Sequence, residues 1–327
     1  MKRIFISTPI FFIIGFLTFY FWGSSGSLDT NQLSTKIVYQ SNYRKSNDTI
    51  KVMTFNMGYL SGMTNNLPID RNEQFFANNL AKAKEVIRQT SPDIIGLQEV
   101  DFGSARSFHY NQLDSLAGAG DYAEAYKSVN WDKKYVPFPY WPFSMHFGEM
   151  LSGQAILSGY ELSEIETIVL DKPINASLLY NAFYLDRLVQ ISKVAIGGRD
   201  LVILNVHLEA FDFETRVQHA EVLRGVYESF ADDYPVLLIG DFNSAPSYVD
   251  ATDAMSILLS IDGISSAISQ DMYDQGGYET FTSESPDRMI DYVLFNSNRL
   301  AVVDARVVYE AGNISDHLPV IAKLIIK

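Results

Sequence analysis

The sequence of 327 residues contains no cysteine. This absence excludes disulfide frameworks, thiolate metal sites, cysteine nucleophiles and a lipid-modified N-terminal cysteine. Positive charge is also scarce, because 25 Lys and Arg residues face 39 Asp and Glu residues and leave a formal net charge of −14. Such a chain offers no broad basic track to a nucleic acid. An anionic substrate would therefore need a local site, most simply one built around a metal ion.

The composition that is present, 47% hydrophobic and 13% aromatic, is that of an ordinary globular protein. It excludes a disordered, collagen-like or coiled-coil chain. From Ile50 onward, short apolar runs alternate with helical patterns, which indicates an α/β fold. Eight strands are predicted, at residues 51–56, 93–100, 153–157, 187–194, 201–207, 236–241, 289–295 and 320–326. Four helices are predicted, at residues 73–89, 105–117, 213–230 and 247–259.

The N-terminus carries the longest apolar run, 19 uncharged residues from Ile4 to Trp22 that follow Lys2 and Arg3. As a helix rising about 1.5 Å per residue, the run would be roughly 28 Å long, close to the hydrocarbon core of a bilayer. It fits an uncleaved signal-anchor, whereas Pro9 and the small residues 23–26 fit a cleaved signal peptide. A buried core helix is disfavoured, because the run is apolar all round.

This N-terminal segment also predicts where the protein resides. Positive charge before the span keeps the N-terminus cytoplasmic. The remainder is expected outside the cytoplasm, anchored in the cell membrane, or secreted or periplasmic if the segment is cleaved. We therefore divide the chain into residues 1–22, a signal-anchor, transmembrane or signal segment, residues 23–49, a flexible tether rich in Ser, Asn, Thr and Gly, and residues 50–327, one globular domain.

Several predicted strands end in a polar side chain. These residues are Asn56, Glu99, His207, Asp241 with Asn243, and Asp291. A buried apolar strand does not tolerate a charge or an imidazole at its end unless something pairs with it. In α/β sheets, the loops beyond the strand ends are where ligands bind. Converging in one crevice, these side chains would form an oxygen-rich metal site with histidines beside it.

Each motif also has a structural interpretation when it stands alone. Asn56 and Gly58 are compatible with a simple turn, and His207 with a core histidine whose hydrogen bonds are satisfied. Arg187 enters a predicted strand, where it could clamp a phosphate or form an ion pair with Asp186 or another acid. The segment 240–246 is more distinctive, since an acid and an amide stand two apart after a glycine at the end of an apolar strand.

Taken in order, these motifs resemble a known family. The series TFN, LQE, NVHL, GDFN, IDY and SDH, at residues 54–56, 97–99, 205–208, 240–243, 290–292 and 315–317, is similar to that of the endonuclease/exonuclease/phosphatase superfamily. This group includes pancreatic deoxyribonuclease, apurinic-site endonucleases, inositol polyphosphate 5-phosphatases and neutral sphingomyelinases. The resemblance covers residues 51–326. It implies a four-layer α/β sandwich, with two mixed β-sheets packed face to face and helices outside, and makes residues 50–327 a catalytic domain for divalent-metal-dependent hydrolysis of a phosphoester.

The resemblance also implies roles for the metal ligands. Glu99 is the first candidate ligand, Asn56 would contribute its carbonyl oxygen, and Asp316 is a further candidate on the metal side. Mg²⁺, with Mn²⁺ as an alternative, takes such oxygen ligands and keeps several waters, so one or two carboxylates suffice. The metal would polarise a phosphoryl oxygen and stabilise the leaving oxygen.

The remaining residues would act on the attacking water and the phosphate. By resemblance, Asp241 orients or deprotonates the water, and Asn243 donates a hydrogen bond to a phosphoryl oxygen. His317 would be held by Asp291, a carboxylate–imidazole pair that favours the charged imidazole. His207 would donate to the phosphate in the transition state. Whether His317 acts as a general base or as an electrostatic clamp stays open.

The stretch at residues 135–150 bears on the choice of phosphoester, since it holds three prolines and six aromatic residues. It predicts either a loop packed over a sheet edge or an apolar rim that touches lipid or a stacked base. Acidity and extracytoplasmic placement favour a lipid head group or small phosphodiester over duplex DNA. We expect a membrane-anchored, Mg²⁺-dependent phosphodiesterase or phosphatase, with phospholipid or sphingolipid as a candidate substrate and no obligate protein partner. The alternatives are an extracytoplasmic nuclease and a catalytically inactive binding module.

Overall fold

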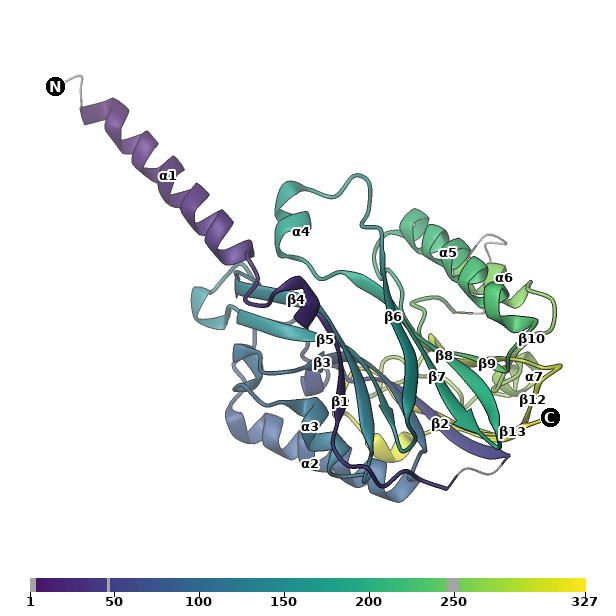
Figure 1. Ribbon diagram of the computed structural model, residues 1–327. Coiled ribbons are helices and arrows are strands. Elements are labelled where there is room, and N and C mark those ends of the chain that lie inside the picture. Colours follow the sequence, from purple (N-terminus) through teal and green to yellow (C-terminus); the bar gives the residue numbers. More distant parts are fainter. Residues whose placement is uncertain (1–3, 46–47, 246–252) are drawn as a thin grey trace.

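The computed structural model describes residues 4–45, 48–245 and 253–327, with side chains from Ile10 onward. Two β-sheets form the centre of the described chain (Figure 1). The first has the order β1-β4-β5-β3-β2-β13-β12, formed by Ser34–Val38, Glu124–Val136, Gly148–Ser158, Ile94–Asp101, Thr49–Asn56, Val320–Ile326 and Leu300–Val307. The second has the order β10-β11-β9-β8-β7-β6, formed by Ile264–Ser266, Asp291–Asn296, Val236–Asp241, Arg199–His207, Arg187–Ile196 and Leu162–Leu170. Both sheets are mixed, since β2 with β3 and β8 with β9 are parallel pairs among antiparallel neighbours.

Helices cover the outer faces of both sheets (Figure 1). The first sheet is covered by α2 (Glu73–Thr90) and α3 (Gln112–Ala117), and the second by α5 (Phe213–Ala231) and α6 (Ala254–Leu259). The remaining helices are α1 (Ile4–Ser24), α4 (Leu178–Phe183) and α7 (Gln270–Asp274). In α2, which corresponds to the helix predicted at residues 73–89, the apolar face is buried, and the Asn72 side chain caps the helix by accepting a hydrogen bond from Phe75 N. The predicted four-layer α/β sandwich is therefore confirmed.

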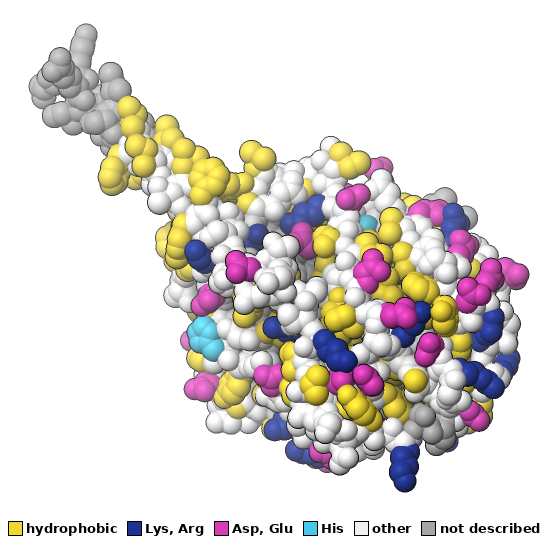
Figure 2. Space-filling view, in the orientation of Figure 1, with side chains coloured by type: hydrophobic (Ala, Val, Ile, Leu, Met, Phe, Trp, Pro, Cys, Tyr) yellow, Lys and Arg dark blue, Asp and Glu magenta, His cyan; other side chains and the backbone are white. Residues whose placement is uncertain are grey.

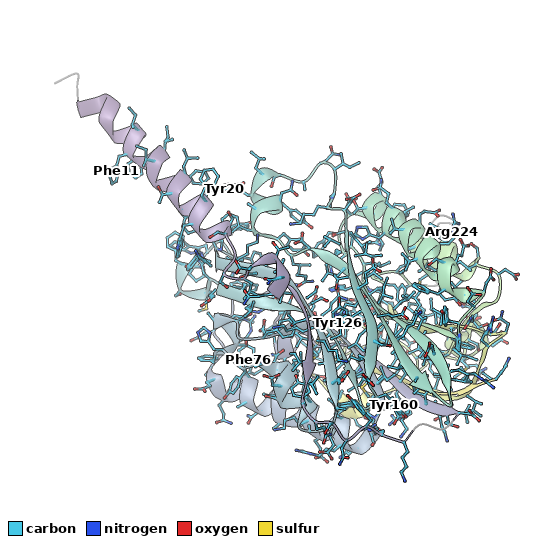
Figure 3. All side chains as sticks on the ribbon, viewed as in Figure 1. Phe11, Tyr20, Phe76, Tyr126, Tyr160 and Arg224 are labelled. Atoms are coloured by element: carbon cyan, nitrogen blue, oxygen red, sulfur yellow. The ribbon has the colours of Figure 1, made fainter. Side chains whose placement is uncertain are left out.

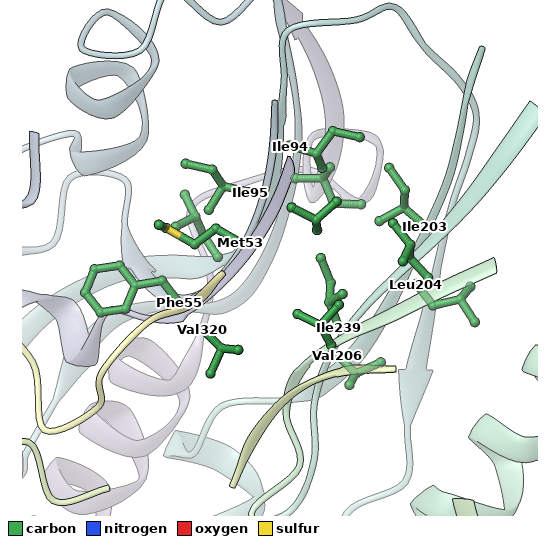
Figure 4. Close-up of a cluster of buried hydrophobic side chains, with 14 of the residues drawn as sticks. Met53, Phe55, Ile94, Ile95, Ile203, Leu204, Val206, Ile239 and Val320 are labelled. Atoms are coloured by element: carbon green, nitrogen blue, oxygen red, sulfur yellow. The ribbon is translucent and has the colours of Figure 1, made fainter. Parts of the chain in front are cut away.

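The two sheets meet through an apolar interface that also contains buried amides. Figure 4 shows Ile94 on the side of β3 that faces β8 and β9, while Met53 lies on the opposite side of the first sheet. Across the interface, Gln98 Nε2 donates to Asn205 Oδ1 at 2.6 Å, and within the second sheet Asn205 Nδ2 donates to Gln190 Oε1 at 2.8 Å. A satisfied buried network of this kind fixes one relative position of the elements that it joins. The strand ends of both sheets are thereby held at the same end of the sandwich.

The predicted strands are all present, but β1, β4, β6, β10 and β12 were not predicted. In β6, the four consecutive residues 163–166 are all exposed. The strand therefore lacks the alternation of buried and exposed residues by which a half-buried strand is predicted. β1 lies inside residues 23–49 and pairs with β4 at the edge of the first sheet. The prediction of a flexible tether is therefore wrong for these five residues.

Two predicted helices are shorter than expected. Residues 105–117 form a 3₁₀ turn at Ala105–Ser107 and then α3, because Phe108 and His109 adopt φ values of 57° and 59°, which end a right-handed helix. The helix predicted at residues 247–259 begins at Ala254 in α6, and residues 247–252 lie outside the described part of the chain.

Helix α1 projects from the body, and its C-terminal half docks against it (Figures 1 and 3). Phe11 is 75% exposed, whereas the ring of Phe19 lies 6.1 Å from that of Phe183 in α4, and Tyr20 Oη donates to Leu178 O at 3.2 Å. Figure 2 shows hydrophobic side chains gathered along the described part of this helix. Among the residues described here, no helix has the length and hydropathy needed to cross a membrane. Side chains 4–9 of the predicted span lie outside the described residues.

Candidate active site

The site begins where β8, β9 and β11 of the second sheet meet. His207 ends β8 and Asp241 ends β9, and the parallel register places them side by side. β11 runs antiparallel to β9, so that its first residue, Asp291, also lies opposite Asp241. Gly240 makes this close approach possible, since a Cβ there would lie 2.1 Å from Val206 O and its φ of 150° is open mainly to glycine.

The first sheet contributes Asn56 from the end of β2 and Glu99 from β3. Asn56 Nδ2 donates to Asp241 Oδ2 at 2.8 Å, a hydrogen bond that joins the two sheets, and Asn56 Oδ1 accepts from Gly58 N at 3.0 Å. Glu99 lies in a β-bulge, where the register of β3 against β5 shifts between Leu97 and Val100. Its φ of 49° is rare for a non-glycine residue and turns its side chain out of the normal alternation.

His317 is held by Asp291 from behind. The imidazole Nδ1 lies 2.9 Å from Asp291 Oδ2, which also accepts a hydrogen bond from Thr280 Oγ1 at 2.6 Å. The other ring nitrogen, Nε2, lies 3.7 Å from Asp241 Oδ2. Burial opposes the charged imidazole, but the carboxylates of Asp291 and Asp241 outweigh it and raise the pKa of His317 to about 10. His317 is therefore protonated at neutral pH.

Asp241 is the point at which these contacts converge. Its Oδ1 accepts from Asn243 N at 2.8 Å, and Asn243 Nδ2 donates to Leu208 O at 3.1 Å. Asn243 has a φ of 49°, which asparagine tolerates better than most residues. Burial raises the pKa of Asp241 to about 6, although the positive charge of His317 favours the carboxylate. The carboxylate is therefore available to accept a proton near neutral pH.

Arg187 and His207 form the side of the site nearest β7. Arg187 Nη1 donates to His207 Nε2, and Arg187 Nε lies 3.5 Å from Glu209 Oε2. The acid paired with Arg187 is thus Glu209, while Asp186 pairs with Lys172 at 3.1 Å. Burial, with the charges of Arg187 and His317, lowers the pKa of His207 well below its usual value. The neutral His207 Nε2 accepts a hydrogen bond from Arg187 in this structure. Donation of a hydrogen bond from His207 to the phosphate remains a prediction.

Two half-buried acids, Glu99 and Asp316, lie on the other side of the site, and neighbouring positive charges offset only part of the cost of burying them. Burial raises the pKa of Glu99, opposed chiefly by His317, and Asn65 Nδ2 donates to Glu99 Oε2 at 2.9 Å. Burial also raises the pKa of Asp316 to about 6, which His317 opposes and the Glu99 carboxylate reinforces. Within the described residues, the buried Asn65 Oδ1 has no hydrogen-bond partner. Two carboxylates and a free amide oxygen are the ligand types that a hard divalent cation takes.

A second group of ligand types lies within the same site. Ligand atoms of Asp241, Asp291 and His317 all lie within 4.8 Å of one another. The ligand atoms of this group are already used on one another, because His317 Nδ1 lies 2.9 Å from Asp291 Oδ2, which also accepts a hydrogen bond from Thr280 Oγ1. The donor set of Glu99 and Asp316 therefore fits a cation better than this group does.

One cavity of about 700 Å³ connects these side chains with an apolar wall. Seven of the predicted site residues line it: Glu99, Arg187, His207, Asp241, Asn243, Asp316 and His317. Asn56 and Asp291 lie behind this lining and are 1% and 0% exposed. The structure thus brings all nine predicted residues together, seven at the cavity surface and two supporting them.

Several residues of the site were not predicted. They are Tyr59, Asn65, Arg106, Tyr184, Glu209 and Thr280, of which all but Glu209 and Thr280 line the cavity. Glu209 had a usable signal, because an acid two residues after His207 continues the run of polar groups at the end of β8. Asn65 lies in an irregular turn, and Arg106 lies in a 3₁₀ turn at the start of the helix predicted at residues 105–117, so a helical periodicity did not indicate its direction.

Comparisons with known proteins identify the family and the fold. The family model described as the endonuclease/exonuclease/phosphatase family matches residues 53–317. An endonuclease/exonuclease/phosphatase from Beutenbergia cavernae has a similar structure, with 22% identity, a TM-score of 0.62, and coverage of 85% of this chain and 72% of that one. A mannosyl-6-phosphatase from Bacteroides thetaiotaomicron is 15% identical with a TM-score of 0.60, and covers 85% and 100% of the two chains.

A third solved structure, truncated TDP2 from Caenorhabditis elegans, is 18% identical with a TM-score of 0.56, and the match covers 85% of this chain and 97% of that one. At these identities the structures show a shared fold. No curated protein matches the sequence. Because the family model spans most of the chain and contains every strand-end motif of the site, this chain belongs to the endonuclease/exonuclease/phosphatase family.

Proposed function

We propose that the protein is a membrane-associated, divalent-metal-dependent phosphodiesterase or phosphatase that acts outside the cytoplasm on an amphiphilic phosphoester, a phospholipid or sphingolipid. The observation that carries the proposal is the division of the cavity into a polar end and an aromatic end. Phe16, Phe19 and Tyr20 of α1 line it together with Phe183 of α4, while the acids and histidines of the site line the other end. A phosphate at the polar end would place an attached apolar chain against α1.

The metal would be Mg²⁺, with Mn²⁺ as an alternative, held by Glu99 and Asp316. The amide oxygens of Asn65 and Asn56 are available beside them, since the Asn65 oxygen has no partner among the described residues and the Asn56 oxygen retains a second lone pair after accepting from Gly58 N. When bound, the ion would polarise a phosphoryl oxygen and stabilise the leaving oxygen.

The chain's own residues would then orient the water and stabilise charge on the phosphate. Asp241 is held by Asn56 and Asn243 with one oxygen near His317 Nε2, so it can orient a water and accept its proton. Arg187 and the protonated His317 supply fixed positive charge where the phosphoryl oxygens gain negative charge. Asn243, which now donates to Leu208 O, is placed at the cavity surface to donate to phosphate instead.

Two further observations support a lipid substrate and membrane association. The loop at residues 137–147 exposes Tyr140, Trp141 and Phe143 by 72%, 72% and 68%, and Tyr140 also lines the cavity. Exposed Trp and Tyr are typical of a membrane interface. The described start of α1 is similarly exposed, with Phe11 at 75% and Phe12 at 70%. The loop and the helix thus present apolar surface beside the same cavity.

The test begins with the reaction and then turns to the substrate. Full-length protein in mixed micelles should hydrolyse bis-p-nitrophenyl phosphate with Mg²⁺, and EDTA should abolish the activity. His317→Ala should abolish it as well, whereas His109→Ala, which removes an exposed imidazole bound to Gly103 O, should not. Absence of Mg²⁺-dependent turnover in wild type would refute the enzyme and favour the inactive binding module.

A substrate panel then separates the remaining candidates. Sphingomyelin and phosphatidylcholine in the same micelles should release phosphorylated head groups faster than plasmid DNA is cut. Degradation of plasmid DNA with no product from either lipid would identify a nuclease and overturn the lipid assignment. For the anchor, fractionation of the producing cells should recover the full-length chain in the membrane pellet, and its recovery as soluble protein would contradict the proposed association.

A further inference from the structure

A buried arginine, Arg106, faces the cavity without the hydrogen bonds that its guanidinium requires. Its side chain is 3% exposed and lines the cavity. The guanidinium carbon lies 3.3 Å from the centre of the Tyr59 ring, 4.7 Å from that of Phe147 and 5.6 Å from that of Trp131. We call these three rings the aromatic cage. The guanidinium carbon lies over these rings, which contact its positive charge but accept no hydrogen bond from its N–H groups.

The edges of Arg106 have one weak partner among the described residues. Nε lies 3.5 Å from Asp101 Oδ2 without forming a hydrogen bond, because Asp101 is oriented by Ser104 Oγ, which donates to its other oxygen at 2.6 Å. Within the described chain, Nε, Nη1 and Nη2 of Arg106 all lack a hydrogen-bond acceptor. A guanidinium carries five N–H donors, and buried donors in native proteins are normally paired. The unpaired edge therefore indicates a ligand that accepts hydrogen bonds.

Other charges near Arg106 favour an anionic ligand. Arg71 lies close enough that burial and the charge of Arg106 lower its pKa to about 10. Nε and Nη2 of Arg71 already donate to the oxygens of Thr64 and to Leu67 O. The positive charges of Arg71 and Arg106 repel each other, and an anion bound beside them would reduce this repulsion. Two carboxylates act on Arg106, Asp101 at 3.5 Å and Glu99 through its charge, but neither accepts a hydrogen bond from its guanidinium.

The position of Arg106 relative to the catalytic groups distinguishes it from the phosphate-binding residues. Arg187 begins β7 and Asn243 follows β9 of the second sheet, whereas Arg106 follows β3 of the first sheet, the strand that carries Glu99. A phosphate held between Glu99 and the second sheet would therefore leave Arg106 facing a different part of the substrate. Its planar fork suits two oxygens of one carboxylate or phosphate.

We propose that Arg106, held in the aromatic cage, forms a second anion-binding subsite that recognises a carboxylate or phosphate on the substrate beside the scissile phosphoester. This inference rests on the proposed function and makes it more specific. The enzyme would prefer lipids whose head group carries an additional negative charge. A role limited to packing the cage would give no such preference.

The test compares head groups that differ in this second charge. Full-length protein with Mg²⁺ is assayed in identical mixed micelles on phosphatidylcholine, which lacks it, on phosphatidylserine, which adds a carboxylate, and on phosphatidylinositol 4-phosphate, which adds a phosphate. Wild type should show a higher kcat/KM for one of the two anionic lipids, and the lipid preferred identifies the anion. Arg106→Met keeps the packing stem and should reduce that preference roughly 10- to 100-fold, mainly through KM.

Two variants keep the result interpretable. Arg106→Lys retains the charge without the fork and should recover part of the preference, even if Arg106→Met is less stable. Arg224→Met removes an exposed arginine on α5 (Figure 3), paired with Glu221, and should leave the preference at its wild-type value.

The outcomes separate this subsite from the proposed function. Loss of the preference in Arg106→Met with retention in Arg224→Met supports the subsite. An active wild type without any preference, or a preference that persists in Arg106→Met, overturns the subsite alone. A wild type that hydrolyses neither bis-p-nitrophenyl phosphate nor the lipids overturns the function and the subsite together.

Discussion

Replacing Asp291 by asparagine tests how His317 is held in its charged form. Asp291→Asn keeps the size of the side chain but replaces the carboxylate that lies 2.9 Å from His317 Nδ1. Asp291 is the largest of the influences that raise the pKa of His317, while burial lowers it. We therefore expect the pKa of His317 to fall below about 10 in the variant.

The effect on stability follows from the same pair. Both side chains are buried, with exposed fractions of 6% and 1%, and removing one partner of such a pair costs about 3 kcal/mol or more. Because the pKa of His317 is raised above its usual 6.5, the stabilisation is complete below pH 6.5 and is lost as the pH rises through about 10. The difference in free energy of unfolding between wild type and Asp291→Asn should accordingly shrink between these pH values.

The assay combines urea unfolding at several pH values with the pH profile of kcat/KM on bis-p-nitrophenyl phosphate. We expect kcat to fall roughly 10²- to 10⁴-fold at neutral pH, the range typical of a positioned acid or base. Asp304→Asn, at an exposed position of β12, is the matched control and should behave like wild type. Wild-type activity and an unchanged pH profile in Asp291→Asn would show that His317 does not depend on Asp291.

Three further perturbations address the metal, the pH response and the apolar wall. Glu99→Gln should raise the Mg²⁺ concentration for half-maximal activity by roughly 10-fold or more, and an unchanged titration would remove Glu99 from the metal site. Burial raises the pKa of Asp241 from 3.8 to about 6, so the free energy of unfolding falls as the pH rises through this window. The uncharged replacement Asp241→Asn should flatten this pH dependence in urea unfolding, and an equally steep pH dependence in the variant would contradict the raised pKa. Phe19→Ala should raise KM for long-chain phosphatidylcholine at least several-fold, while Val222→Ala, at an exposed position of α5 outside the cavity, should not, and equal effects of the two would place the apolar chain elsewhere.

The parts of the site that follow strand ends could be predicted from the sequence, because a buried strand has a fixed direction and a fixed end. Asn56, His207 and Asp241 each close an apolar run, and the sheets bring those ends together. The orientation of Glu99 could not be predicted in this way. It depends on a bulge that forms only against β5, a strand more than 45 residues further along the chain.

Long-range pairing explains the other differences as well. β1 has a polar sequence that indicates a tether, and it becomes a strand only because the edge of β4 is available to it. The sequence allowed Arg187 to form an ion pair with Asp186 or with another acid. The antiparallel pairing of β7 with β8 brings Glu209 next to Arg187, and Glu209 is the acid with which it pairs. The aromatic cage of Arg106 is assembled from three separate segments, so no local pattern reveals it.

The hydrogen bond from Asn56 to Asp241 has a consequence for how the protein loses activity. It joins the last residue of β2 to the last residue of β9, so a slip of one sheet along the other would separate the candidate metal ligands from the residue that orients the water. Neither sheet needs to unfold for this to happen. Turnover is thus a more sensitive reporter of sheet alignment than circular dichroism, and heating should silence the enzyme before its helices and strands are lost.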